Sequence, residues 1–68
     1  MEFNAALEKI TEQVQWLLEN SSTEKRREKF SNQAFGMLQT LDIFFPEEDD
    51  KISSIWYEYR DRFNKLVF

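Results

Sequence analysis

The chain has 68 residues and a mass of 8.3 kDa, so we expect one domain, close to the lower size limit for a single unaided core. It contains no Cys and no His, which excludes a disulfide framework, a thiolate zinc site and the commonest catalytic base. A net charge of −4 argues against a general nucleic-acid binder, because such a protein needs a basic surface. The aromatic content of 16% supplies large apolar side chains that can build a core in a short chain.

Apolar residues run for no more than three positions at a time, as in residues 16–18, so no segment is predicted to cross a membrane. The N-terminal sequence Met1-Glu2-Phe3 has neither the basic region nor the apolar region of a secretory signal. With no Cys in the chain, these features predict a cytoplasmic protein.

The first predicted helix covers roughly residues 3–20. Its apolar residues recur at alternating steps of four and three positions, which places them on one helical face. This face carries Phe3, Leu7, Ile10, Val14 and Leu17, with Leu18 beside it.

A polar break at residues 20–23 precedes the second predicted helix, roughly residues 22–44. Ser21 followed by Glu24 fits a capping box, and Ser22 or Thr23 would cap the helix nearly as well. The first two turns are fully charged, and Gly36 leaves open whether the helix is continuous. Its apolar face is predicted to hold Phe30, Ala34, Met37, Leu38, Leu41, Phe44 and Phe45.

The second break contains Pro46, which disfavours helix at the preceding residue and suits a first helical turn. Four acidic residues follow it, and negative charge at a helix start is favourable to the helix dipole. Asp49 or Asp50 is the predicted N-cap of a third helix, roughly residues 49–67. Its apolar face holds Ile52, Ile55, Trp56, Tyr59, Phe63, Leu66 and Val67.

These patterns predict an all-α fold in which residues 1–68 form a single helical domain, a small up-down-up three-helix bundle. Both breaks are short, as is usual between antiparallel helices. The predicted core consists of Leu7, Ile10, Val14, Leu17, Phe30, Ala34, Leu38, Leu41, Trp56, Tyr59, Phe63 and Leu66.

Each predicted helix has at least one large apolar residue outside its core-facing stripe. One interpretation is that small bundles bury wide stripes and leave scattered apolar residues exposed. The other is a second contact surface, because exposed apolar patches mark interfaces and Trp and Tyr are enriched in binding hot spots. The candidate partner-binding residues are Trp16, Phe35, Ile43, Tyr57 and Phe68.

Two charged segments are further candidates. Lys25, Arg26, Arg27 and Lys29 form the only basic cluster, which is either a solvated helix face or a contact for phosphate or another anion. The acidic run Glu47, Glu48, Asp49 and Asp50 complements the helix dipole, docks a basic protein surface or imitates a phosphate backbone. The run lacks the spacing of a calcium-binding loop, so no metal site is predicted.

The function predicted from these features is that of a non-enzymatic protein–protein interaction module: a small regulator, inhibitor or adaptor. It would dock through its surplus aromatic residues and acidic patches onto another protein or onto a second copy of itself as a homodimer. We expect no enzyme activity, cofactor, small-molecule substrate or membrane contact. Two alternatives stay open: a dimeric nucleic-acid-binding regulator that uses the Lys25–Lys29 cluster, and a structural subunit that completes a larger assembly.

Overall fold

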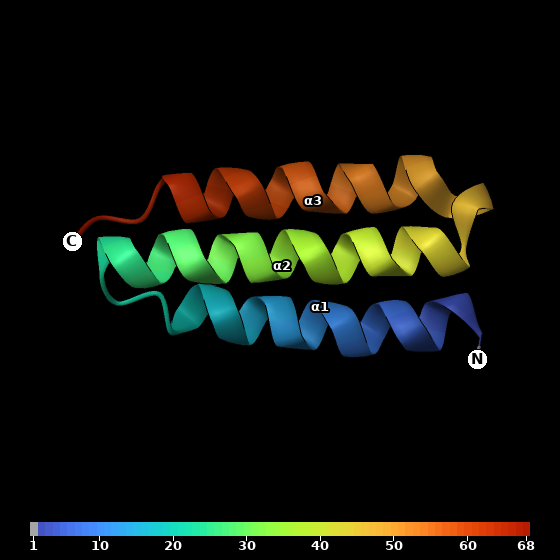
Figure 1. The fold of residues 1–68 in the computed structure, drawn as a ribbon, viewed down its shortest axis with the longest axis horizontal. Coiled ribbons are helices and arrows are strands. Elements are labelled where there is room, and N and C mark those ends of the chain that lie inside the picture. Colours follow the sequence, from blue (N-terminus) through green and yellow to red (C-terminus); the bar gives the residue numbers. More distant parts are fainter. Residues whose placement is uncertain (1) are drawn as a thin grey trace.

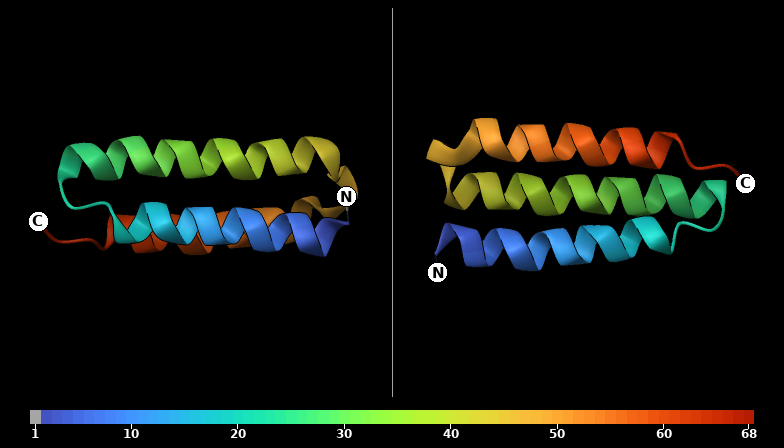
Figure 2. Two further views of the ribbon diagram at one scale, coloured as in Figure 1. Left: turned by 90° about the horizontal axis from the view of Figure 1, so that it is seen from below. Right: turned by 180° about the vertical axis from the view of Figure 1, so that it is seen from behind.

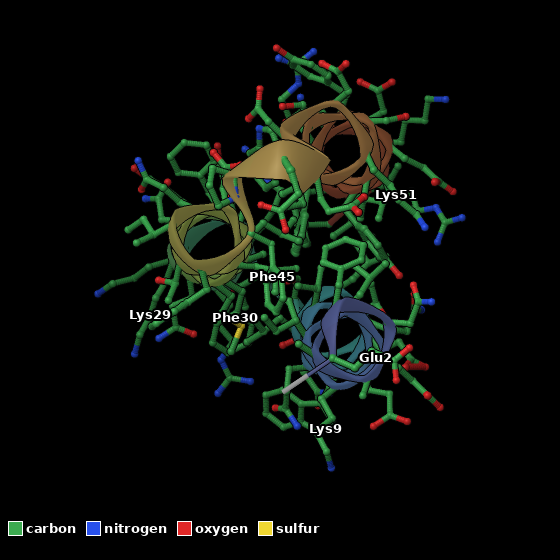
Figure 3. All side chains as sticks on the ribbon, turned by 90° about the vertical axis from the view of Figure 1, so that its right-hand side faces the viewer. Glu2, Lys9, Lys29, Phe30, Phe45 and Lys51 are labelled. Atoms are coloured by element: carbon green, nitrogen blue, oxygen red, sulfur yellow. The ribbon has the colours of Figure 1, made fainter. Side chains whose placement is uncertain are left out.

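The computed structural model of the protein describes residues 2–68, which form three α-helices and no strand (Figure 1). Helices α1 (Phe3–Glu19), α2 (Glu24–Phe44) and α3 (Asp49–Asn64) run up, down and up. Turned views show α2 on one side of the bundle and α1 and α3 together on the other, and the end-on view shows the helices arranged as a triangle (Figures 2 and 3). This arrangement confirms the predicted all-α three-helix bundle.

The cap of α2 is Thr23, one of the three hydroxyl residues that the sequence allows. Its backbone is extended, with φ −137° and ψ 161°, so its Oγ1 accepts a hydrogen bond from the Arg26 amide at 3.1 Å. The hydroxyl of Ser21 instead donates to the Leu17 carbonyl at 2.7 Å and is buried. The capping box of Ser21 and Glu24 is therefore wrong, and α2 begins two residues later than predicted.

A short 3₁₀ turn, η1 (Pro46–Glu48), connects α2 to α3. The Glu48 amide donates to the Phe45 carbonyl at 2.9 Å, and α3 follows directly without a side-chain cap. Asp49 and Asp50 therefore lie in the first turn of α3 rather than at its N-cap, where their charge still favours the helix dipole.

The C-terminal end of α3 comes three residues earlier than predicted. The Lys65 amide still bonds to the Asp61 and Arg62 carbonyls, and the chain then leaves the helix. Leu66 packs on the core from this turn, so the apolar spacing extends past the helix itself. Val67, which was expected on the core-facing stripe, is exposed as a result.

The core consists of two clusters of buried side chains along the bundle. One contains Ala6, Leu38, Leu41 and Ile52, and the other contains Val14, Leu17, Ala34 and Phe63. Ile10 and Trp56 are partly buried and pack against both clusters, so they join them.

The predicted core differs from the observed one mainly at its edges. Ala6 and Ile52 are buried although neither belongs to the predicted core. Six predicted core residues are only partly buried and pack against the two clusters from outside: Leu7, Ile10, Phe30, Trp56, Tyr59 and Leu66. Each helix has only two neighbours, so residues at the edge of its apolar stripe stay partly open to solvent, whereas Leu38 and Phe63 are buried.

Gly36 lies within a continuous α2, which settles the question that the sequence left open. A Cβ atom added there would meet no other atom within 4 Å. We expect Gly36→Ala to stabilise the protein by about 1 kcal/mol, because alanine has the higher helix propensity and restricts the unfolded chain. Urea unfolding followed by circular dichroism measures this gain, and an unchanged or lower midpoint would contradict a continuous helix at this position.

Candidate protein-interaction surface

Phe35 and Tyr57 come together on the side of the bundle where α2 meets α3. Their side chains, 44% and 53% exposed, flank the partly buried Trp56, and the Phe35 and Trp56 rings lie 5.0 Å apart. With Leu38, Ile52 and several polar residues they line a depression of about 360 Å³, which we call the α2/α3 groove. The polar residues that line it are Gln39, Asp42, Asp49, Ser53 and Arg60.

Two carboxyl groups lie at the end of this groove nearest η1. Asp42 is near the C-terminal end of α2 and Asp49 is the first residue of α3, so the connection brings them together. The Oδ1 atom of Asp42 is buried and has no hydrogen-bond partner. Burial raises the pKa of Asp42 above its ordinary value. Asp49 raises this pKa further, because protonated Asp42 can donate a hydrogen bond to the Asp49 carboxylate and because the two negative charges repel each other.

The raised pKa of Asp42 predicts a pH-dependent effect of Asp42→Asn on stability. The folded state binds the Asp42 proton more tightly than the unfolded chain does, so protonation of Asp42 stabilises the fold. This stabilisation is complete below the ordinary pKa of 3.8 and is lost as the pH rises through the pKa of the folded state. Removing the charge should therefore raise the thermal midpoint at pH 7 and leave it nearly unchanged at about pH 3.

The control is Asp61→Asn, which alters an exposed carboxylate 4.0 Å from Arg60 and should change the midpoint little at either pH. Calorimetry at both pH values makes the comparison. A lower midpoint for Asp42→Asn at pH 7 would show that the ionised carboxylate stabilises the fold.

A second apolar area lies between α1 and α2. Trp16, 54% exposed, leans on Phe30 with 6.1 Å between ring centroids. Farther along the same two helices, a depression of about 590 Å³ is lined by Ala6, Ile10, Thr40, Leu41, Phe44 and Phe45. Trp16 is thus on a different side of the bundle from Phe35 and Tyr57.

Phe44 was expected to face the core, but its side chain is 74% exposed. The neighbouring Phe45 takes the inward position (Figure 3). Its ring meets the Phe3 ring edge-on, with 5.3 Å between the ring centroids. One inward position at the end of α2 is therefore filled by one of two adjacent Phe residues. Sequence periodicity alone assigned both of them to the same stripe.

The residues of the basic cluster at the start of α2 make different contacts. Arg26 donates from Nη1 to the Ser22 Oγ at 3.2 Å, and the half-buried Arg27 lies 6.0 Å from the Phe68 ring. Lys25 and Lys29 are exposed. Arg27 and Phe68 thus interact with each other within the chain.

The remaining predicted site residues do not line the α2/α3 groove. Ile43 is exposed on α2, while Glu47 and Glu48 lie in η1 and Asp50 in the first turn of α3. Sequence reasoning missed Asp42 as a site residue. Its spacing of seven residues from Phe35, two helical turns, was the available signal.

The protein is a small three-helix bundle, and the comparisons assign it to no more specific class. Comparison of the chain with protein-family models, curated proteins and solved structures found no match. In the part of the chain that the structure describes, no three His, Cys, Asp or Glu side chains gather to hold a metal ion. Each helix within residues 2–68 is too short or too polar to cross a membrane.

Proposed function

We propose that the protein is a non-enzymatic interaction module, a small regulator, inhibitor or adaptor, that docks onto another protein through the α2/α3 groove. The observation that carries this proposal is the pair Phe35 and Tyr57, each about half exposed beside Trp56. Aromatic side chains around a depression are typical of binding hot spots. The groove is open, apolar at its floor and polar at its rim, as interfaces are.

The alternative of a nucleic-acid-binding regulator receives less support. Glu24 and Glu28 interrupt the basic cluster, and Arg27 is directed to Phe68. Contact with a phosphate backbone requires a surface with an excess of positive charge. We therefore place the partner-binding function on the groove and not on the start of α2.

A photo-crosslinking experiment tests the proposal. Benzoyl-phenylalanine at Phe35 should form a covalent adduct with a specific protein in the cells that produce the chain. The same probe at Gln33, an exposed residue on the same helix and outside the groove, is the matched control. Identical adducts from both positions, or none from Phe35, would contradict the proposal.

Self-association requires a separate measurement, because a second copy of the chain is also a protein partner. Light scattering over a wide dilution range should give the mass of a monomer if the groove serves a foreign partner. The single substitutions Trp16→Ser and Tyr57→Ser then test the two apolar areas separately, because only Tyr57 lines the groove. If neither substitution changes partner binding or self-association, surface aromatic residues do not carry the function.

A further inference from the structure

We propose that the acidic end of the α2/α3 groove receives a lysine or arginine side chain from the partner protein, with its hydrocarbon stem against Phe35 and Trp56. This inference rests on the proposed function, and it adds the chemistry of the partner. The geometry of the carboxyl pair, the aromatic walls and the charge of this end of the bundle each support it.

The carboxyl pair lacks a cation. In residues 2–68, ion pairs within 4.0 Å join Arg60 to Asp61 and Arg62 to Glu58, and none reaches Asp42 or Asp49. Lys51, the nearest basic residue in sequence, places its Nζ 5.4 Å from the Phe3 ring instead. Asp42 Oδ1 is shielded from solvent and accepts no hydrogen bond, so no donor within the described residues offsets the charge at that atom. An ammonium or guanidinium group placed beside the carboxyl pair would offset this charge.

The walls of the groove suit the stem of a basic side chain. Lys and Arg bury their methylene groups on apolar surface while the charged head reaches a polar partner. Phe35 and Trp56 provide such a surface in the same groove, about two helical turns or 10 Å along the helix axes from Asp42 and Asp49. The groove already contains one contact of this kind, because the Arg60 guanidinium lies 4.9 Å from the Tyr57 ring.

Arg60 does not fill the acidic end. It follows Asp49 by eleven residues on α3, about 16 Å along a helix axis. The groove therefore has a cation at one end and two carboxyl groups without one at the other. A partner with a basic residue at the acidic end complements this distribution.

The charge of the whole end of the bundle favours a basic partner. Residues 34–56, which surround the α2–α3 connection in Figure 1, contain five acidic residues and one basic residue, Lys51. Clustered charge of one sign accelerates association with a partner of the opposite sign and makes it sensitive to salt. The acidic run thus steers the partner, and the carboxyl pair in the groove binds its side chain.

Selection from a library of random peptides on the immobilised protein tests this inference. The expected peptides contain Lys or Arg next to an apolar residue. Trp16→Phe leaves Trp56 as the single Trp, so its fluorescence reports binding in the groove. Combining Asp42→Asn with Asp49→Asn should weaken the selected peptides by at least about tenfold.

The matched control combines Glu48→Gln with Asp50→Asn, which removes two charges at the same end without altering the groove lining. It should retain affinity within about twofold at moderate salt, because exposed charges act mainly through screened, long-range attraction. Circular dichroism confirms that both double variants are folded. If the two weaken binding equally, net charge rather than the carboxyl pair attracts the peptide, and the inference is overturned.

Other outcomes separate this inference from the proposed function. The inference would be overturned if the selected peptides lacked basic residues and still bound the variants of Asp42 and Asp49. If Phe35→Ser abolished the binding of these peptides, the groove would remain the docking site. Peptides unaffected by Phe35→Ser, or no enriched peptide, would contradict both. Light scattering could instead reveal a concentration-dependent dimer that is abolished by Lys25→Glu and Lys29→Glu. A second copy of the chain would then occupy the groove, and the assignment to a foreign partner would be overturned.

Discussion

Phe63→Ala is expected to leave the protein largely unfolded at 25 °C. The Phe63 side chain is 1% exposed and packs in the buried cluster with Val14, Leu17 and Ala34. Truncating a buried Phe to Ala costs about 3–5 kcal/mol through lost burial and the cavity that remains. A domain of this size has a total stability of about the same magnitude, so the variant should lose most of its helical circular dichroism.

Phe68→Ala makes the same chemical change at the exposed end of the chain and serves as the control. Phe68 is 56% exposed, and its ring lies 6.0 Å from the Arg27 guanidinium. Loss of this contact should cost less than about 1 kcal/mol. Equal losses at positions 63 and 68 would mean that the buried cluster does not hold the helices together as described.

The helices were predictable because each has an apolar stripe at helical spacing, but their ends were not. Ser21, Ser22 and Thr23 are chemically similar caps, and only the backbone conformation decides that Thr23 accepts the Arg26 amide. At the other end, Leu66 continues the apolar pattern from a turn, so periodicity overran the helix. Hydrogen-bond geometry therefore determined what residue spacing left undecided.

The candidate site was predictable only in part. Phe35 and Tyr57 lie outside the core-facing stripes, and that anomaly is a sequence property. Their proximity to Asp42 and Asp49 depends on how far α3 is shifted along α2, which the length and shape of η1 determine. Apolar periodicity contains no information about this axial shift, so the carboxyl pair emerged only from the packed structure.

Leu38→Ala is the second substitution with a large expected cost, about 2–5 kcal/mol. Leu38 is 1% exposed, belongs to the cluster with Ala6, Leu41 and Ile52, and also forms part of the groove floor. Ile43→Ala is the control on the same helix, because Ile43 is 73% exposed and should change stability by about 0.5 kcal/mol or less. Urea unfolding of both variants measures the difference, and a cost below about 1 kcal/mol for Leu38→Ala would contradict its burial.

The same variant tests whether the two core clusters unfold as one unit. Ile10 and Trp56 pack against both clusters, so damage to the cluster around Leu38 should destabilise the distant cluster around Phe63 as well. In the Trp16→Phe background, Trp56 fluorescence and helical circular dichroism should then give the same urea midpoint for Leu38→Ala. If the fluorescence transition comes first, the packing around Trp56 loosens before the helices unfold, and a partner that binds in the groove would stabilise this region selectively.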